Sequence, residues 1–332
     1  MRAVSAALLL ALVGCGSAHS GATSSAVDSS AATSDATGDA TDVAADRQAG
    51  PLCNGAAASC ERTLSQVCLA GAHNAMSSAA EGWNFPNQNV AFPALLDLGI
   101  RALLLDIHRW DDPEDDGTAA DAGPELWLCH GNCVLGHRRL ADALADLRSW
   151  LDAHPRDLVF VVFEDAVGAA DVKAALKAAA LVDRAAKLDP AALPTLGAML
   201  DAGIQVVWTA EQKGEKPDGA AFYLDVWALV QDTPYTFKSM AEIDRFEGAA
   251  HACRVNRGQA DAPLLQVNHW VAKVLPAAAL SAEANTLERL LARAAACEAL
   301  RGQKVNLLVV DHADSGEVVR ACRILDGLEA RP

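Results

Sequence analysis

The chain of 332 residues has few aromatic side chains and far fewer basic than acidic ones. Aromatic residues make up 5% of a chain that is 52% hydrophobic, so we expect a core of small aliphatic side chains, as in helix-rich α/β proteins. Lys and Arg number 27 against 43 Asp and Glu, which gives a formal net charge of -16 at pH 7. Such a charge repels nucleic acid and anionic membrane surfaces, so DNA and RNA are not expected partners.

The apolar run near the N-terminus, residues 3–13, is too short to span a bilayer. It follows Arg2 and leads into Leu12-Val13-Gly14-Cys15, which resembles the cleavage box of bacterial lipoproteins. We therefore expect 1–15 to be a lipoprotein signal peptide with lipidation at Cys15. An ordinary secretory peptide with a chance cysteine is the alternative. The expected product is an exported bacterial lipoprotein at the outer membrane or cell surface.

Residues 16–50 contain Ser, Ala, Thr, Gly and Asp with almost no large apolar side chain. Such a segment cannot bury enough surface to offset the entropy lost on ordering, so we expect a flexible low-complexity linker. The remaining residues, 51–330, have the length and composition of one large domain, near the usual size of an α/β barrel. The sequence therefore predicts a signal peptide, a linker and a single folded domain.

The nine cysteines include no Cys-x-x-Cys pair, so a zinc site is not favoured. If Cys15 is lipidated, an even number remains, which in an exported chain suggests disulfides. Cys129 with Cys133, and Cys53 with Cys60, are candidates for local bridges. Spacing alone does not determine how the others pair.

Several short apolar segments rich in Val, Leu and Ile have the composition of buried strands. Segment 139–153 has apolar residues at helical spacing from Leu140 to Leu151, and Pro155 follows it. Strands alternating with helices predict a parallel sheet, and continuous apolar strands indicate that both faces are covered. We therefore expect an α/β fold, a single distorted TIM-like (β/α) barrel that closes on itself. The expected strands are 66–70, 102–107, 126–129, 158–163, 205–208, 264–267 and 305–310, and the expected helices are 139–153, 171–186 and 282–299.

Polar side chains stand at the ends of six of these expected strands. In a barrel of parallel strands the C-terminal strand ends meet at one mouth, where active sites are found. Any single one of these residues has an ordinary structural explanation as a hydrogen-bonded loop residue, but six polar strand ends together predict a site. The residues concerned are His73, Asn74, Asp106, His108, His130, Glu164, Asp165, Asn268, His269, Asp311 and His312.

Two imidazoles on opposite sides of a pocket can divide the work of cleaving a phosphodiester. One accepts a proton from the attacking hydroxyl and the other donates a proton to the leaving oxygen, because the histidine pKa lies near neutral pH. A carboxylate can hold such a histidine in the required tautomer. His73 and His130 are the expected acid–base pair.

The phosphate also needs positive charge in the transition state. Oxygen-bearing side chains at the strand ends, Asn74, Asp106 and Glu164, suit Ca²⁺, a hard cation with flexible coordination. Asp106 and Glu164 could instead only orient the histidines, and Arg109 is a cation supplied by the protein. Calcium therefore stays one of two open possibilities at this point.

These segments together resemble the X-region barrel of phosphatidylinositol-specific phospholipase C and its bacterial relatives. The resemblance covers nearly all of 60–328, with the motifs in family order. It implies a distorted TIM-like barrel that forms a cyclic inositol phosphate, which water then hydrolyses further. The segments that carry it are LAGAHNAM at 69–76, NQN at 87–89, LGIRALLLDIHR at 98–109, LWLCHGNC at 126–133, LRSWLDAHPRDLVFVVFED at 147–165, LLQVNHWV at 264–271 and VNLLVVDHADSGEVVRACRILDGL at 305–328.

By motif position, His73 resembles the general base and His130 the general acid, and Asp311 resembles the carboxylate that pairs with the base. The positions of Asn74, Asp106 and Glu164 are those where calcium-dependent members place ligands. Two positions depart from the family. Leu104 stands where calcium-dependent members have a further acidic ligand, and His108 where metal-independent members have an arginine. His108 and Arg109 are the expected phosphate-binding residues, so calcium, protonated imidazole and Arg109 all remain candidate sources of charge.

The resemblance implies a phosphoric diester hydrolase acting on a phospholipid or inositol phosphate substrate. A glycerophosphodiester phosphodiesterase uses a similar barrel, but its site begins with His-Arg followed by a Glu-x-Asp pair. Here His73 is followed by Asn74, and Asp106 by Ile107-His108, so this function ranks second. A surface-anchored binding lipoprotein that lost catalysis is a third alternative, against which the presence of both His73 and His130 argues. The sequence does not predict an oligomeric state.

Overall fold

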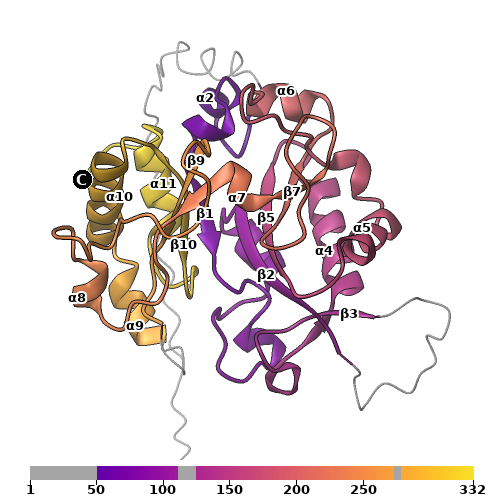
Figure 1. The fold of residues 1–332 in the computed structure, drawn as a ribbon, viewed down its shortest axis with the longest axis horizontal. Helices are drawn as coiled ribbons and strands as arrows, with labels where there is room; N and C mark the ends of the chain where they lie inside the picture. Colours follow the sequence, from indigo (N-terminus) through magenta and orange to yellow (C-terminus); the bar gives the residue numbers. More distant parts are fainter. Residues whose placement is uncertain (1–50, 111–124, 273–277) are drawn as a thin grey trace, which may run out of the picture. The chain divides into compact units, whose positions relative to one another are not determined.

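A curled sheet of parallel strands forms the centre of this computed structural model, which describes residues 51–110, 125–272 and 278–332. The strand order is β7-β6-β5-β2-β1-β10-β9-β8, and every neighbouring pair along it is parallel. Figure 1 shows these strands between helices α10 and α11 on one side and α4 and α5 on the other. The strands are β1 Leu69–Ala72, β2 Ala102–Arg109, β3 Leu126–Leu128, β4 Arg138–Arg139, β5 Val159–Asp165, β6 Val206–Ala210, β7 Tyr223–Asp225, β8 Val230–Asp232, β9 Leu264–Asn268 and β10 Val305–Val310.

Both faces of the central strands are buried, as expected for a parallel sheet inside a shell of helices. Successive side chains along each strand point to opposite faces of the sheet and pack in two different hydrophobic cores. Leu104 and Val162 belong to the core enclosed by the curled sheet, whereas Leu103 and Val161 pack in the core shared with helices such as α4. The same alternation continues past the last apolar residues, so polar side chains that follow Leu104 and Val162 by two positions face the interior at the mouth of the barrel.

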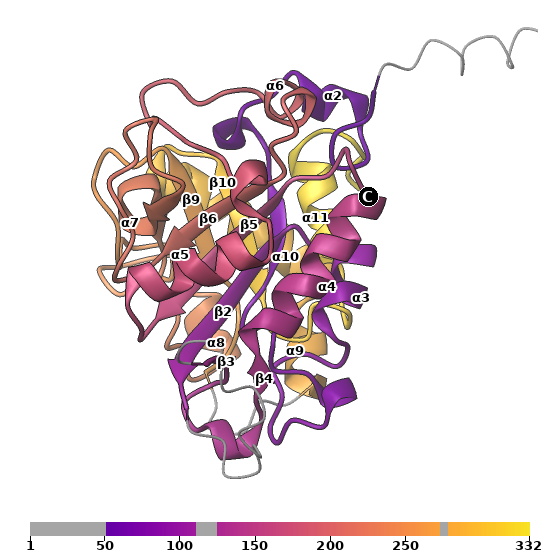
Figure 2. The same cartoon turned by 90° about the vertical axis from the view of Figure 1, so that its right-hand side faces the viewer.

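Helices cover the outer face of the sheet, and Figure 2 shows α3, α4, α10 and α11 around it. The apolar face of α4 is buried, and Gly302 in the left-handed conformation ends α10. The helices are α2 Ala57–Cys60, α3 Phe92–Asp97, α4 Leu140–Ala153, α5 Ala169–Ala178, α6 Leu196–Asp201, α7 Val226–Leu229, α8 Met240–Ile243, α9 Ala278–Ala284, α10 Leu287–Arg301 and α11 Val318–Leu325.

The expected helices agree with the structure at 139–153 and differ in the other two cases. The helix expected over 171–186 is α5, which ends at Ala178 because the chain turns at Ala180 with a positive φ of 54°. The helix expected over 282–299 is divided into α9 and α10, since Thr286 takes an extended conformation between them. A run of alanine, 178–180, continues the helical pattern across the first interruption, and the second falls at Thr286 between two segments of helical composition, so periodicity alone does not detect them.

The α/β fold class is confirmed, but closure of the barrel is not. In the described part of the chain the ladder ends at β7 and β8, which do not pair with each other. The third expected strand also differs, because β3 runs antiparallel to β2 and pairs in turn, again antiparallel, with β4. β2 extends past the rim of the barrel, and β3 returns along that extension. The end of β3 therefore reaches the same mouth although its direction is reversed.

Four disulfides link the cysteines of the described domain. The two local bridges expected from the sequence, Cys53–Cys60 and Cys129–Cys133, are confirmed. Cys68–Cys322 joins the start of β1 to α11, and Cys253–Cys297 ties a loop to α10. Among the described helices none is both long and apolar enough to span a bilayer. The predictions for 1–15, 16–50 and Cys15 concern residues outside the described part of the chain.

Candidate active site

His73 and Asp311 are adjacent because β1 and β10 pair in register, with Ala72 opposite Val310. Each of the two residues directly follows its strand. Nδ1 of His73 lies 2.8 Å from Oδ1 of Asp311, in a hydrogen bond that is also an ion pair when the ring is charged. With Nδ1 held by the carboxylate, Nε2 is the ring nitrogen that can exchange a proton with a bound substrate.

His130 and Asp106 form a second histidine–carboxylate pair, with Nδ1 of His130 2.8 Å from Oδ2 of Asp106. The hydrogen bond to Asp106 is the main cause of a raised His130 pKa, and partial burial opposes it. The antiparallel β3 carries the chain back to β2, so the Asp106 carbonyl accepts a hydrogen bond from the Cys129 amide at 3.3 Å. The raised pKa favours the protonated ring, which is the form a general acid needs.

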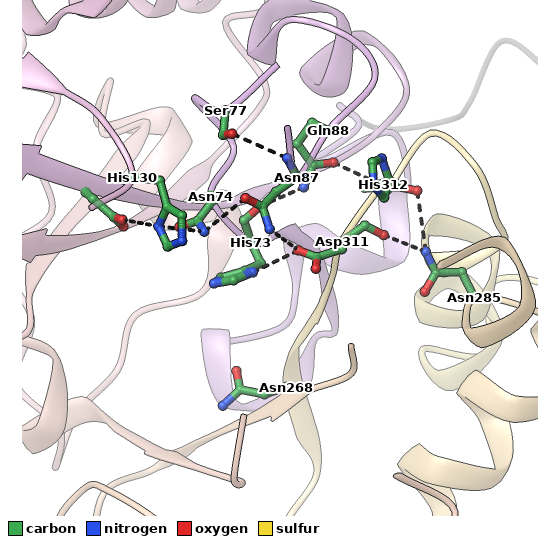
Figure 3. A network of polar contacts seen from close by, with 12 residues as sticks. His73, Asn74, Ser77, Asn87, Gln88, His130, Asn268, Asn285, Asp311 and His312 are labelled. Atoms are coloured by element: carbon green, nitrogen blue, oxygen red, sulfur yellow. Dashed lines mark hydrogen bonds and ion pairs between the residues drawn. The ribbon is translucent and has the colours of Figure 1, made fainter. Parts of the chain in front are cut away.

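A chain of side-chain contacts joins the two pairs, as Figure 3 shows. Nδ2 of Asn87 donates to Asp311 Oδ1 at 3.1 Å, and Oδ1 of Asn87 accepts from Nδ2 of Asn74 at 3.2 Å. The same Asn74 nitrogen lies 3.1 Å from Nδ1 of His130. Asn74 itself has a φ of 45°, a left-handed conformation that asparagine tolerates better than most residues. The two histidines are therefore in contact with one connected group of polar side chains.

Both histidines face a pair of adjoining hollows at the mouth of the barrel. His73, Glu164, Tyr235 and Trp270 line both hollows, and His130 and Asp311 line the outer one. The rings of His73 and His130 have centroids 6.4 Å apart, a separation on the scale of one phosphodiester group. Trp270 stacks on the His73 ring at 4.0 Å, so the ring is fixed by stacking and by the bond to Asp311.

The inner hollow carries an acidic group and an arginine that the sequence analysis did not single out. Arg257 donates to Oδ2 of Asp232 from Nε at 2.9 Å and from Nη2 at 2.7 Å, and from Nη1 to Glu211 at 2.8 Å. Its guanidinium lies over the rings of Trp227 and Tyr235. Burial raises the pKa of Glu211 to about 7, against the influence of Arg257. Arg257 comes from the loop before β9, and no strand-end pattern identifies it.

The expected calcium ligands Asn74, Asp106 and Glu164 all line the inner hollow. Asp106 and Glu164 are register partners on β2 and β5, two positions beyond Leu104 and Val162. Burial raises the Glu164 pKa, and the neighbouring Asp106 raises it further. Across the described residues, no cluster of three or more His, Cys, Asp and Glu side chains has the arrangement of a metal site. A cation here would rely on these two carboxylates and the Asn74 amide oxygen.

The two expected phosphate-binding residues do not line either hollow. Arg109 lies at the end of β2 and forms an ion pair with Asp171, near the start of α5. His108 stands opposite Trp127 in the β2–β3 hairpin, beyond the rim of the barrel. Because β2 continues past the mouth as a hairpin, residues two and three positions after Asp106 are carried away from the site. The structure therefore does not bring His108 and Arg109 to the histidine pair.

Exposed apolar side chains stand around the outer hollow. Phe85, Leu135 and Tyr235 line it, and their exposed fractions are 50%, 41% and 38%. Next to Leu135, Val134 is 69% exposed. The loops carrying Phe85 and Leu135 are joined by a 2.7 Å hydrogen bond from the amide of Asn84 to the Leu135 carbonyl. These four residues form an apolar rim at the mouth of the site.

Comparison with solved structures identifies the class of fold. Phosphatidylinositol-specific phospholipase C from Listeria monocytogenes aligns with a TM-score of 0.52 and 13% identity, over 82% of this chain and 96% of that one. A Staphylococcus aureus phosphatidylinositol-specific phospholipase C, studied for its membrane binding, aligns with a TM-score of 0.51 and 12% identity, over 78% and 93% of the two chains. The fold is thus the distorted α/β barrel of these enzymes.

Sequence comparison places the chain within that class. The model of the PI-PLC X family matches residues 59–326, and the chain belongs to this family. A curated relative, PI-PLC X domain-containing protein 1 from the fungus Arthroderma benhamiae, is 24% identical over 301 residues, which cover 83% of this chain and 90% of the fungal one. The family and the paired histidines together indicate a phosphodiesterase-type function.

Proposed function

We propose that this protein cleaves the head-group phosphodiester of a glycerophospholipid through a cyclic phosphate, with His73 as general base and His130 as general acid. The observation that carries the proposal is the facing pair of histidines, each bonded through Nδ1 to its own carboxylate at 2.8 Å. Membership of the PI-PLC X family supports an inositol-type head group.

The reaction has two stages in this proposal. Nε2 of His73 accepts the proton of a head-group hydroxyl, whose oxygen attacks phosphorus. The bond from phosphorus to the glyceride oxygen breaks, and His130 donates its proton to that oxygen, releasing diacylglycerol and a cyclic phosphate. Water can then open the ring with the two histidines in exchanged roles. Positioned acid–base groups of this kind contribute about 10²- to 10⁴-fold to a rate.

The apolar rim favours a lipid substrate over a soluble glycerophosphodiester. Large side chains such as Phe85 and Leu135 are exposed directly at the mouth, where a soluble substrate gives them nothing to contact. A lipid whose head group occupies the hollows brings its acyl chains to this rim. This observation ranks the glycerophosphodiester phosphodiesterase alternative second.

The test uses the purified protein with mixed phosphatidylcholine and phosphatidylinositol vesicles, followed by ³¹P NMR. We expect a cyclic inositol phosphate to appear before any inositol monophosphate, together with diacylglycerol. Soluble glycerophosphoinositol is the comparison substrate and should react much more slowly. Faster cleavage of glycerophosphoinositol would favour the second enzyme function, and a folded protein that cleaves neither would favour a binding lipoprotein.

We also propose that Ca²⁺ is held at the mouth by Asn74, Asp106 and Glu164. The support is that the three side chains line one hollow, with two carboxylates on neighbouring strands. The one described arginine of that hollow, Arg257, is already bonded to Asp232 and Glu211. A bound calcium ion would supply positive charge to the phosphate during the reaction.

The proposed place of action is the outer membrane or cell surface of a bacterium, reached by export and by lipidation at Cys15. The support comes from the sequence of 1–15 and from the disulfides, which form and persist in oxidising compartments. An anchored enzyme of this kind would meet its lipid substrate at a membrane.

A further inference from the structure

Asn87 is the side chain through which the two histidine–carboxylate pairs are connected. It is 4% exposed and lies in the segment 87–89, between the loop after β1 and the loop after β10. Its amide nitrogen donates to Asp311 and its amide oxygen accepts from Asn74. The donor and the acceptor of one side-chain amide therefore each form a hydrogen bond, on opposite sides of the site.

The backbone of Asn87 is fixed independently of its side chain. Its amide donates to Ser77 Oγ at 3.3 Å, and its carbonyl accepts from the His312 amide at 2.7 Å. The neighbouring Gln88 donates to the His73 carbonyl and accepts from the Ala313 amide. These contacts hold the segment in place, so the amide group of Asn87 can be removed without releasing the loop.

The direction of these bonds has consequences for both histidines. The donated bond leaves the Asp311 carboxylate in place to receive Nδ1 of His73. The accepted bond holds the Asn74 nitrogen beside Nδ1 of His130 at 3.1 Å. Because the Nδ1–H of the protonated ring donates to Asp106, the Asn74 nitrogen packs against His130 and does not donate to it. A substitution that removes either the donated or the accepted bond of Asn87 should therefore change the surroundings of one histidine.

We infer that Asn87 is a positioning residue for the reaction, orienting the His73–Asp311 pair on one side and the Asn74–His130 contact on the other. This inference rests on the proposed function. Buried groups that orient site residues typically contribute about 10- to 100-fold when removed. Asn87 lines the outer hollow, but it is 4% exposed and its side-chain nitrogen and oxygen are bonded to Asp311 and Asn74, so we expect its contribution in the turnover step.

The chain offers a matched control two residues away. Asn89 links the same two loops, with its amide nitrogen 3.2 and 3.1 Å from the Asp314 carboxylate oxygens and 2.8 Å from Ser315 Oγ. It is an asparagine in the same segment, with the same kind of bond, but it touches neither histidine pair. Asn87→Ala and Asn89→Ala should therefore differ in catalysis, and because Asn89 is less buried than Asn87, the free energy of unfolding of both variants is measured alongside.

The experiment measures kcat and KM of both variants on phosphatidylinositol vesicles. We expect Asn87→Ala to lower kcat about 10- to 100-fold with KM within about twofold of wild type. Asn89→Ala should keep the wild-type kcat. Equal kcat values in the two variants would overturn the inference.

Asn87→Asp separates the two bonds, because a carboxylate can still accept from Asn74 but cannot donate to Asp311. A second carboxylate beside Asp311 also repels it. We expect kcat at least as low as in Asn87→Ala. A wild-type kcat in this variant would show that the donated bond is not needed, and the inference would fail.

A readout without turnover keeps the inference separate from the proposed function. In the resting protein at fixed pH, Asn87→Ala should move the imidazole NMR signals of both His73 and His130, and Asn89→Ala should move neither. Unmoved signals in Asn87→Ala would overturn the inference even if the wild type proved inactive. If the signals move in Asn87→Ala but the wild type proves inactive, only the proposed function is contradicted.

Discussion

At the scale of single residues, the two histidines differ in how their rings are held in place and in how exposed they are. His73 is held by Asp311 and by stacking on Trp270, and its side chain is 21% exposed. His130 is more open, with 55% of its side chain exposed, and depends on Asp106 for orientation. The raised pKa of His130 agrees with its proposed role as the general acid, which must carry a proton before the reaction.

The charge of His130 should depend on Asp106 in a measurable way. Without calcium, an NMR titration of the wild type should give a His130 pKa above the ordinary value of about 6.5. Asp106→Asn removes the largest cause of the increase and leaves burial, which lowers the pKa. The His130 pKa should therefore fall, and the protonated form should be lost at lower pH.

Asp171→Asn is the control for this titration, since Asp171 pairs with Arg109 outside the site. It should leave the His130 titration unchanged. A His130 pKa that does not move in Asp106→Asn would contradict the role of Asp106.

At the scale of elements, the site is produced by register and by strand alternation. β1 and β10 bring His73 to Asp311, and β2 and β5 bring Asp106 beside Glu164. These convergences could be predicted from the sequence, because apolar runs followed by polar residues mark strand ends. The antiparallel β3 could not, since a three-residue strand has no pattern that gives its direction.

Arg257 lies on the loop before β9, where no pattern in the sequence indicates a position at the mouth, and Trp270 resembles an ordinary core residue. Glu211 directly follows β6, so its strand-end position could have been predicted, but the strand expected over 205–208 ends two residues too early. The error for Arg109 arose because a residue next to a strand end was assumed to stay at the mouth. The long-range bridge Cys68–Cys322 likewise depends on which elements pack together, which spacing does not reveal.

The proposed calcium site lies at these strand ends, and we expect Glu164→Gln to weaken Ca²⁺ binding there. Isothermal titration of the chelator-treated protein with Ca²⁺ should detect one site in the wild type and a loss of at least about tenfold in affinity in the variant. Glu283→Gln, on the exposed surface of α9, is the control. EDTA should also reduce turnover. Full activity in EDTA, with no heat of Ca²⁺ binding, would contradict the calcium proposal.

At the scale of the whole molecule, charge and apolar surface act in opposite directions. The net charge of -16 repels strongly anionic membranes, whereas the apolar rim around Phe85 and Leu135 favours contact with lipid. If the proposed function holds, a protein with this surface would gain from being tethered to the membrane that carries its substrate. Lipidation at Cys15 would supply such a tether.

The tether can be tested by fractionation after expression in a bacterial host with a lipoprotein pathway. The wild type should sediment with membranes, and Cys15→Ser should move most of the protein to the soluble exported fraction while leaving its activity on vesicles intact. Unchanged fractionation in Cys15→Ser would contradict the lipid anchor and favour an ordinary secretory peptide.

The central claim is that His73 and His130 are one acid–base pair, and the most direct measurement is the turnover of His73→Ala and His130→Ala on phosphatidylinositol vesicles by ³¹P NMR. We expect each variant to lose about 10²- to 10⁴-fold in kcat while keeping the wild-type Tm. We also expect the double variant to be little slower than either single one, because the two residues act as a unit. A folded variant with near wild-type kcat at either position would contradict the claim.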